Sequence, residues 1–142
     1  MQPTPSQIKE IAEQLDCGFC CYYHKISGEV VFIPDFEDCM DDIEEFYGED
    51  LAKIKKDKKN FIIINKPSAR ESFEIMEKFI EEVNDTKLKN DLMNALNKKK
   101  PFSHFKLIIE TSTYRQNWFA FKEKQLQQHV LDKSYSTINQ TC

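Results

Sequence analysis

The stretch GFCCYYHKISGEVVFIP, residues 18–34, decides the fold of this chain. It contains two runs that are rich in aromatic and β-branched residues, and a short turn with Ser27 and Gly28 separates them. Such a pattern is typical of a β-hairpin, and it predicts strands near residues 18–25 and 29–33. The hairpin cannot bury its apolar side chains alone, so the rest of the chain must cover it.

A third strand and a first helix are predicted on either side of the hairpin. The apolar run FIIIN, residues 61–65, is rich in β-branched residues and predicts a strand buried on both faces. Before the hairpin, apolar residues recur at helical spacing over residues 7–16, and Ser6 is a suitable N-cap. We therefore expect a small antiparallel sheet formed by the hairpin and one further strand.

An acidic segment links the hairpin to the third strand. Nine of the sixteen residues at 35–50 are acidic, yet apolar residues recur at steps of three and four, which predicts a helix with a solvated acidic face. Gly48 is expected to divide this helix into two pieces. Five lysines at positions 53–59 lie towards its C-terminal end, where positive charge suits the helix dipole.

The second half of the chain is predicted to be helical from residue 69 to residue 135. Ser68 is positioned to cap the first of four helices, and Pro101 suits the first turn of the third. Five apolar residues are expected to form the buried centre of this half: Phe79, Leu92, Phe105, Trp118 and Phe119. The fold class is then α+β, with residues 1–142 as a single domain, residues 1–68 as its first part and residues 136–142 as a frayed tail.

Composition limits the class of protein. The chain has 142 residues, 40% hydrophobic and 31% charged, and its apolar runs are too short to span a bilayer. The N-terminus MQPTPSQIKE lacks a basic start followed by an apolar stretch, so we expect a cytoplasmic location and reduced thiols. Residues 98–142 contain eight Lys or Arg and three acidic residues, a net charge of +5, so residues 1–97 carry −9 of the total of −4.

The helical segments resemble a known family. EIMEKFIEEVNDTKLKNDLMNALNKKKPFSHFK at residues 74–106 and NWFAFKEKQL at residues 117–126 are similar to the C-terminal core of the bacterial uncharacterised protein family 158. The hairpin sequence KISGEVVFI is similar to the N-terminal half of that family, and the likeness extends from about residue 7 to residue 133. The resemblance implies a small cytosolic bacterial protein of α and β structure, and it implies no activity.

The cysteine cluster in CGFCCYYHK, residues 17–25, is the most conspicuous candidate site. On a strand, Cys20 and His24 share a face but stand about 13 Å apart at the usual rise per residue, too far to hold one metal ion or to form an activated thiol–imidazole pair. Cys17 and Cys21 are separated by the same distance. We therefore expect no metal, no cofactor and ordinary thiols.

The remaining motifs do not fit a known type of site. DFEDCMDDIEEF lacks the central glycine and the final glutamate of a calcium-binding EF-hand loop, although Asp38, Asp42 and Glu45 could hold a hard cation weakly. A helix-turn-helix is excluded because a β-hairpin follows the first helix. The chain has three glycines and no phosphate-binding loop, and His104 beside Phe102 is expected to pack or cap.

Basic and aromatic residues alternate in KKKPFSHFK and YRQNWFAFK. The helical spacing of the rings, including Phe102 and Phe121, favours core packing, whereas the cations could bind phosphate or a partner from the surface. The candidate surface comprises Lys98, Lys99, Lys100, Arg115 and Lys122. The leading hypothesis is a non-enzymatic protein-interaction or regulatory module; the alternatives are nucleic-acid binding through this surface and an unrecognised hydrolase or metal-dependent enzyme. Partner identity and oligomeric state are left open.

Overall fold

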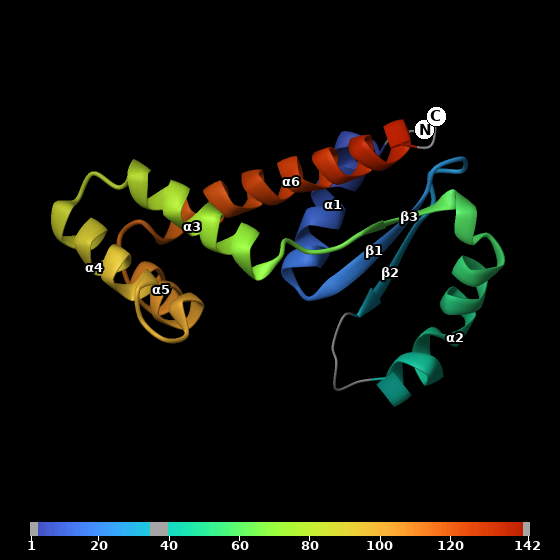
Figure 1. Cartoon of the computed structure of the whole chain (residues 1–142), viewed down its shortest axis with the longest axis horizontal. Helices are drawn as coiled ribbons and strands as arrows, with labels where there is room; N and C mark the ends of the chain where they lie inside the picture. The colour runs from blue at the N-terminus through green and yellow to red at the C-terminus, as the bar shows by residue number, and fades with distance from the viewer. Residues whose placement is uncertain (1–2, 35–39, 141–142) are drawn as a thin grey trace. The chain divides into compact units, whose positions relative to one another are not determined.

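The computed structural model describes residues 3–34 and 40–140, and its side chains over residues 3–34 and 45–134 (Figure 1). The chain forms two compact units. The sheet unit comprises residues 1–66 and 126–142, and the helical unit comprises residues 67–125. Residues 126–135, which the sequence placed with the helical half, thus belong to the sheet unit.

The sheet unit contains the predicted hairpin and third strand. Its elements are α1 (Pro5–Asp16), β1 (Phe19–His24), β2 (Val30–Pro34), α2 (Met40–Lys56), the 3-10 helix η2 (Lys58–Asn60), β3 (Phe61–Ile64) and the end of α6 (Arg115–Gln140). All pairings in the sheet are antiparallel, in the order β2-β1-β3. The predicted α+β class, with a small antiparallel sheet and a helical C-terminal half, is confirmed.

The two faces of the sheet are covered by different helices. On one face, Cys21, Tyr23, Ile62 and Ile64 pack in a core with α1 and with the α6 residues Leu126 and Val130. On the other face, side chains of β1, β2 and β3 pack against α2 in a smaller cluster around Val31, Ile33 and Ile54. Figure 1 shows α2 on one side of the strands and α1 on the other. The sheet is therefore the middle layer of this unit.

Three details of the sheet unit correct the sequence-based expectations. Strand β3 is not buried on both faces, because it is an edge strand and Ile63 is 51% exposed. The N-cap of α1 is Thr4 and not Ser6; Thr4 and Gln7 form a capping box, and Pro5 occupies the first turn. Gly48 does not divide the acidic helix, since α2 is continuous from Met40 to Lys56.

The helical unit contains α3 (Ala69–Glu82), α4 (Thr86–Leu96), α5 (Pro101–Glu110) and the first part of α6. Ser68 caps α3 through a capping box with Glu71, and Pro101 opens α5, as predicted. These residues fix where α3 and α5 begin, and the apolar residues of both helices contribute to one core.

The core of the helical unit is mostly the predicted one. Phe79, Leu92, Phe105 and Trp118 are buried in it. Phe119 was expected to be buried but is only partly so; it lies at the margin of the core, where Arg115 and Lys122 contact its ring. Phe102 is exposed, so the expectation that its ring packs in the core was wrong, and His104 is exposed as well.

The C-terminal end of α6 continues as helix to Gln140, within the tail that the sequence predicted to fray. Among the described helices, none combines the length and the apolar character that crossing a bilayer requires.

Candidate functional site

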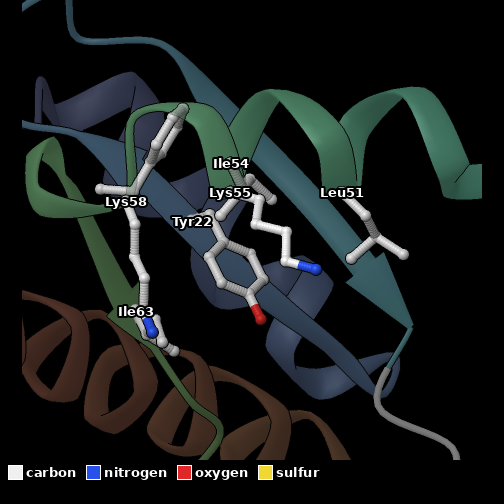
Figure 2. Close-up of a pocket in the computed structure, with 7 residues that line it drawn as sticks. Tyr22, Leu51, Ile54, Lys55, Lys58 and Ile63 are labelled. Carbon is white, nitrogen blue, oxygen red and sulfur yellow. The ribbon is translucent and has the colours of Figure 1, made fainter.

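A groove of about 320 Å³ lies in the sheet unit between α2 and the face formed by β1 and β3 (Figure 2). Five of its lining residues are largely apolar and two are lysines: Tyr22, Leu51, Ile54, Phe61, Ile63, Lys55 and Lys58. Figure 2 shows Tyr22 in the middle, with the side chains of Lys55 and Lys58 on either side of its ring. The groove thus combines an apolar floor with a positively charged rim.

The local structure explains why these side chains meet. Tyr22 pairs with Ile63 across the β1–β3 ladder, so both side chains project from the same face of the sheet. On the opposite wall, Leu51 and Ile54 lie three residues apart on one side of α2, and Lys58 begins the 3-10 helix η2 that follows. Tyr22 stands 29 residues before Leu51, the first wall residue, whereas Ile63 follows the wall segment after a short turn.

The two lysines give the groove its charge. Both are exposed, and neither forms an ion pair with another residue of the described part of the chain. Asp57, which precedes Lys58 in the sequence, pairs with His24. The groove therefore offers two cations to an incoming negative group.

Next to the groove, His24 and Asp57 form a close pair. His24 Nδ1 accepts a hydrogen bond from the Ser27 backbone N–H at 3.0 Å, so Nε2 carries the ring proton and donates to Asp57 Oδ2 at 2.6 Å. Asn60 Nδ2 donates to Asp57 Oδ1 at 2.7 Å. The hydrogen bonds from His24 and Asn60 lower the pKa of the Asp57 carboxyl from its ordinary value.

This pair does not have the arrangement of a catalytic dyad. Because both ring nitrogens of His24 already have hydrogen-bond partners, neither is available to take a proton from a nucleophile in this geometry. The edge of the Phe61 ring packs against the imidazole at 4.8 Å between centroids. The arrangement ties the hairpin turn to the start of β3 and so holds one end of the groove.

The cysteine cluster is dispersed. Cys17 is exposed at the end of α1, whereas Cys20 and Cys21 are buried on opposite faces of β1. Burial raises the pKa of the Cys21 thiol far above its ordinary value, with smaller contributions from Cys20 and Glu10, so it is neutral. In the described residues, no three His, Cys, Asp or Glu side chains are grouped closely enough to hold a metal ion. The absence of a bound metal remains a prediction.

Serine substitutions at Cys20 and Cys21 are expected to lower the free energy of unfolding by different amounts. Cys20 Sγ lies 2.9 Å from Asn65 Oδ1, so a serine hydroxyl there has an acceptor within reach, and Cys20→Ser should cost less than about 1 kcal/mol. Cys21 is fully enclosed by the apolar core, so Cys21→Ser should cost about 1–3 kcal/mol. Urea unfolding of the two variants measures the difference; equal losses would contradict this assignment of environments.

The acidic and basic candidate residues are placed as follows. Asp38 and the side chain of Asp42 lie outside the described residues, and Glu45 is exposed on α2. Lys98, Lys99 and Lys100 are exposed in the loop before α5, and Arg115 follows the other end of that helix. Ten residues of α-helix span about 15 Å, so the three lysines and Arg115 are not one cluster.

Arg115 and Lys122 do share a surface. The Arg115 guanidinium lies 5.2 Å from the centroid of the Phe119 ring, and Lys122 Nζ lies 5.6 Å from it. Lys122 Nζ is also 5.9 Å from the Trp118 ring. These cation–π contacts hold the two side chains against α6.

Comparison with known proteins places the chain in a family. Residues 4–138 match the profile of the Uncharacterised protein family (UPF0158). The chain belongs to this family. It is similar to UPF0158 protein PA5073 of Pseudomonas aeruginosa strain PAO1, with 29% identity over 138 residues that cover 93% of this chain and 82% of the relative. No solved structure shows a significant match. The resemblance seen in the sequence is confirmed.

The family assignment extends over the groove, which sequence reasoning missed. One signal was present, since Leu51, Ile54, Lys55 and Lys58 stand at helical spacing and place two cations beside an apolar stripe. The pairing of Ile63 with Tyr22 could not be predicted, because the sequence near residue 63 does not show which strand it pairs with or that it lies at an open edge.

Proposed function

We propose that this member of UPF0158 is a non-enzymatic recognition module that binds a protein partner in the groove between α2 and the β1–β3 face. The observation that carries the proposal is the groove lining, an apolar surface with Tyr22 at its centre and two lysines at its rim. Aromatic anchors surrounded by charged rims are typical of protein-recognition surfaces.

The chemistry of the lining supports binding more than catalysis. Its polar groups are two ammonium groups and the Tyr22 phenol, which can orient a negative ligand but form no acid–base pair. A space of about 320 Å³ accommodates a few side chains of a protein segment. The partner is expected to present apolar side chains next to carboxylates, since these match the floor and the rim.

A pair of leucine substitutions tests the groove. Leu51→Asp places a carboxylate on the groove wall, whereas Leu107→Asp makes the same change on the exposed side of α5 in the helical unit. A partner captured from bacterial lysate is purified and titrated by calorimetry against each protein. Leu51→Asp should weaken binding by about tenfold or more, and Leu107→Asp by less than about threefold.

Unaltered binding by Leu51→Asp, with the fold intact by circular dichroism, would contradict the proposal. The same titration addresses the nucleic-acid alternative, in which Lys98, Lys99, Lys100, Arg115 and Lys122 contact phosphates. Under that alternative, capture is sensitive to nuclease, neutralising residues 98–100 abolishes it, and affinity falls by about a decade or more between low and physiological salt. Binding in the groove should instead fall less steeply with salt, because only its rim lysines contribute charge contacts.

A further inference from the structure

The outer edge of β3 borders the groove, and its hydrogen-bonding groups can be assigned from the register. Lys25 N–H donates to the Asn60 carbonyl at 2.9 Å, so the pair 25–60 is a hydrogen-bonded pair. Because hydrogen-bonded and non-bonded pairs alternate in an antiparallel ladder, Tyr22 and Ile63 form a non-bonded pair. The backbone N–H and C=O of Ile63 therefore point away from β1, towards the open edge.

At Ile63 the outer edge is unpaired within the described part of the chain, whereas next to β3 the Asn65 carbonyl lies 2.8 Å from His129 Nε2. The sheet order is β2-β1-β3, and the hydrogen bonds found between described residues include none to the Ile63 backbone. Phe61 N–H, which also points outwards, is bonded to the Lys58 carbonyl. The edge thus offers one complete donor–acceptor pair, at Ile63, directly beside the groove.

A strand added at this edge would place alternate side chains in the groove. Neighbouring strands lie about 4.8 Å apart, and residues opposite each other project from the same face of a sheet. Ile63 projects from the groove face, so the residue of an added strand that pairs with Ile63 would point into the groove, as would the residues two positions away. The groove therefore contacts every second residue of the added strand.

Charge distinguishes the possible occupants. Lys58 and Lys59 precede β3, Lys66 follows it, and all three are exposed. If β3 paired with itself in a second copy around Ile63, Lys66 of each copy would stand beside residues 58–60 of the other. Like charges at such positions disfavour edge pairing, whereas an acidic strand would be attracted from both ends.

We infer that the partner segment is an extended acidic peptide that adds to β3 as a fourth strand, with every second residue facing the groove and with both apolar side chains and carboxylates among these residues, so that the carboxylates can reach Lys55 and Lys58. This inference rests on the proposed function and specifies the partner of the same groove. Strand addition of this kind obtains affinity from backbone hydrogen bonds and specificity from alternate side-chain pockets.

The test uses a displayed library of random peptides of about ten residues, selected against the intact protein. The enriched peptides should have both apolar residues and Asp or Glu at positions two apart, which face the groove together. Each is synthesised twice, once unmodified and once with the backbone nitrogens of alternate residues methylated. Methylation in the register that faces β3 should weaken binding by about tenfold or more, and methylation in the other register by less than about threefold.

A matched pair of variants tests the edge from the protein side. Ile63→Pro removes the outward N–H, which is not part of the β1–β3 ladder, whereas Ile63→Thr keeps that N–H and a β-branched side chain. Ile63→Pro should lose about tenfold or more in affinity relative to Ile63→Thr. If Ile63→Pro fails to fold, the methylated peptides still decide.

The outcomes separate the inference from the proposed function. Peptides that bind regardless of backbone methylation, but are lost with Leu51→Asp, would overturn strand addition and leave the groove as a protein-binding site. A dimer of the protein in ultracentrifugation that Ile63→Pro abolishes would overturn the acidic peptide in favour of a second copy. If the selection yields no peptide whose binding depends on Leu51, both strand addition and the proposed groove function are overturned.

Discussion

Trp118→Ala is expected to lower the free energy of unfolding by about 3–5 kcal/mol, the usual cost of emptying a large aromatic site in a core. Trp118 is 6% exposed, and it packs edge-on against Phe105 at 4.9 Å and Phe79 at 5.2 Å between ring centroids. Phe121 stacks on it at 6.5 Å. Three further rings thus lose a contact when the indole is removed.

Phe102→Ala is the control, because Phe102 is 40% exposed and belongs to the same helical unit. Its loss should be below about 1 kcal/mol. Thermal unfolding followed by circular dichroism measures both variants. Trp118 is the single tryptophan of the chain, so native fluorescence reports it directly and should be blue-shifted. Emission like that of free indole, with an unchanged melting temperature, would place the ring on the surface and contradict this core.

The helices could be predicted because each carries a strong local signal. Ser68 with Glu71, and Pro101, mark two starts that the structure reproduces, and apolar residues at steps of three and four mark the buried faces. The hairpin could be predicted in the same way, from two β-rich runs and the turn between them. These signals depend only on residues a few positions apart, so they do not depend on how the rest of the chain folds.

The position of a strand in the sheet carries no such local signal. FIIIN was expected to be buried on both faces, yet Ile63 is exposed, because β1 and not β3 occupies the centre. A short apolar run is consistent with either position. The decision depends on which strands pair with β1, and Cys21 opposite Ile64 is a contact across 43 positions. The groove could not be predicted for the same reason, since its floor forms only when β3 pairs with β1.

Helical periodicity likewise shows that a position is buried without showing in which core. Leu126 and Val130 were read as part of the helical half, but they complete the core of the sheet unit with Ile8 and Ile11. His129, between them, places Nε2 at 2.8 Å from the Asn65 carbonyl at the end of β3. The final turns of α6 are therefore a structural part of the unit that contains the groove.

A single charge tests this role of α6. Val130→Asp should lower the free energy of unfolding by at least about 3 kcal/mol, because it places a carboxylate in an apolar core. Val130 is fully buried, whereas Leu131, the next residue, is 40% exposed. Leu131→Asp is thus the matched control, and it should cost less than about 1 kcal/mol. Similar losses for the two variants would contradict the packing of α6 on the sheet.

Hydrogen exchange locates the damage. A domain has about 5–15 kcal/mol of stability, so the Val130→Asp loss is a large share of it. Protection should fall first in α1 and β1, whose residues Ile11 and Tyr23 share the core with Val130, and less in α3 and α4 of the helical unit. Equal loss across both units would show instead that they unfold together.

The pH dependence of this loss identifies its cause. Burial raises the pKa of a carboxyl in the folded state above the value of about 3.9 found in the unfolded chain. The difference in stability between Val130→Asp and Leu131→Asp should therefore be smallest well below about pH 4, where both carboxyls are protonated, and should grow as the pH rises towards the folded-state pKa. A difference that stays constant with pH would mean that the loss comes from the shape and polarity of the side chain and not from its charge, because ionisation adds a much larger cost of desolvation than the protonated carboxyl carries.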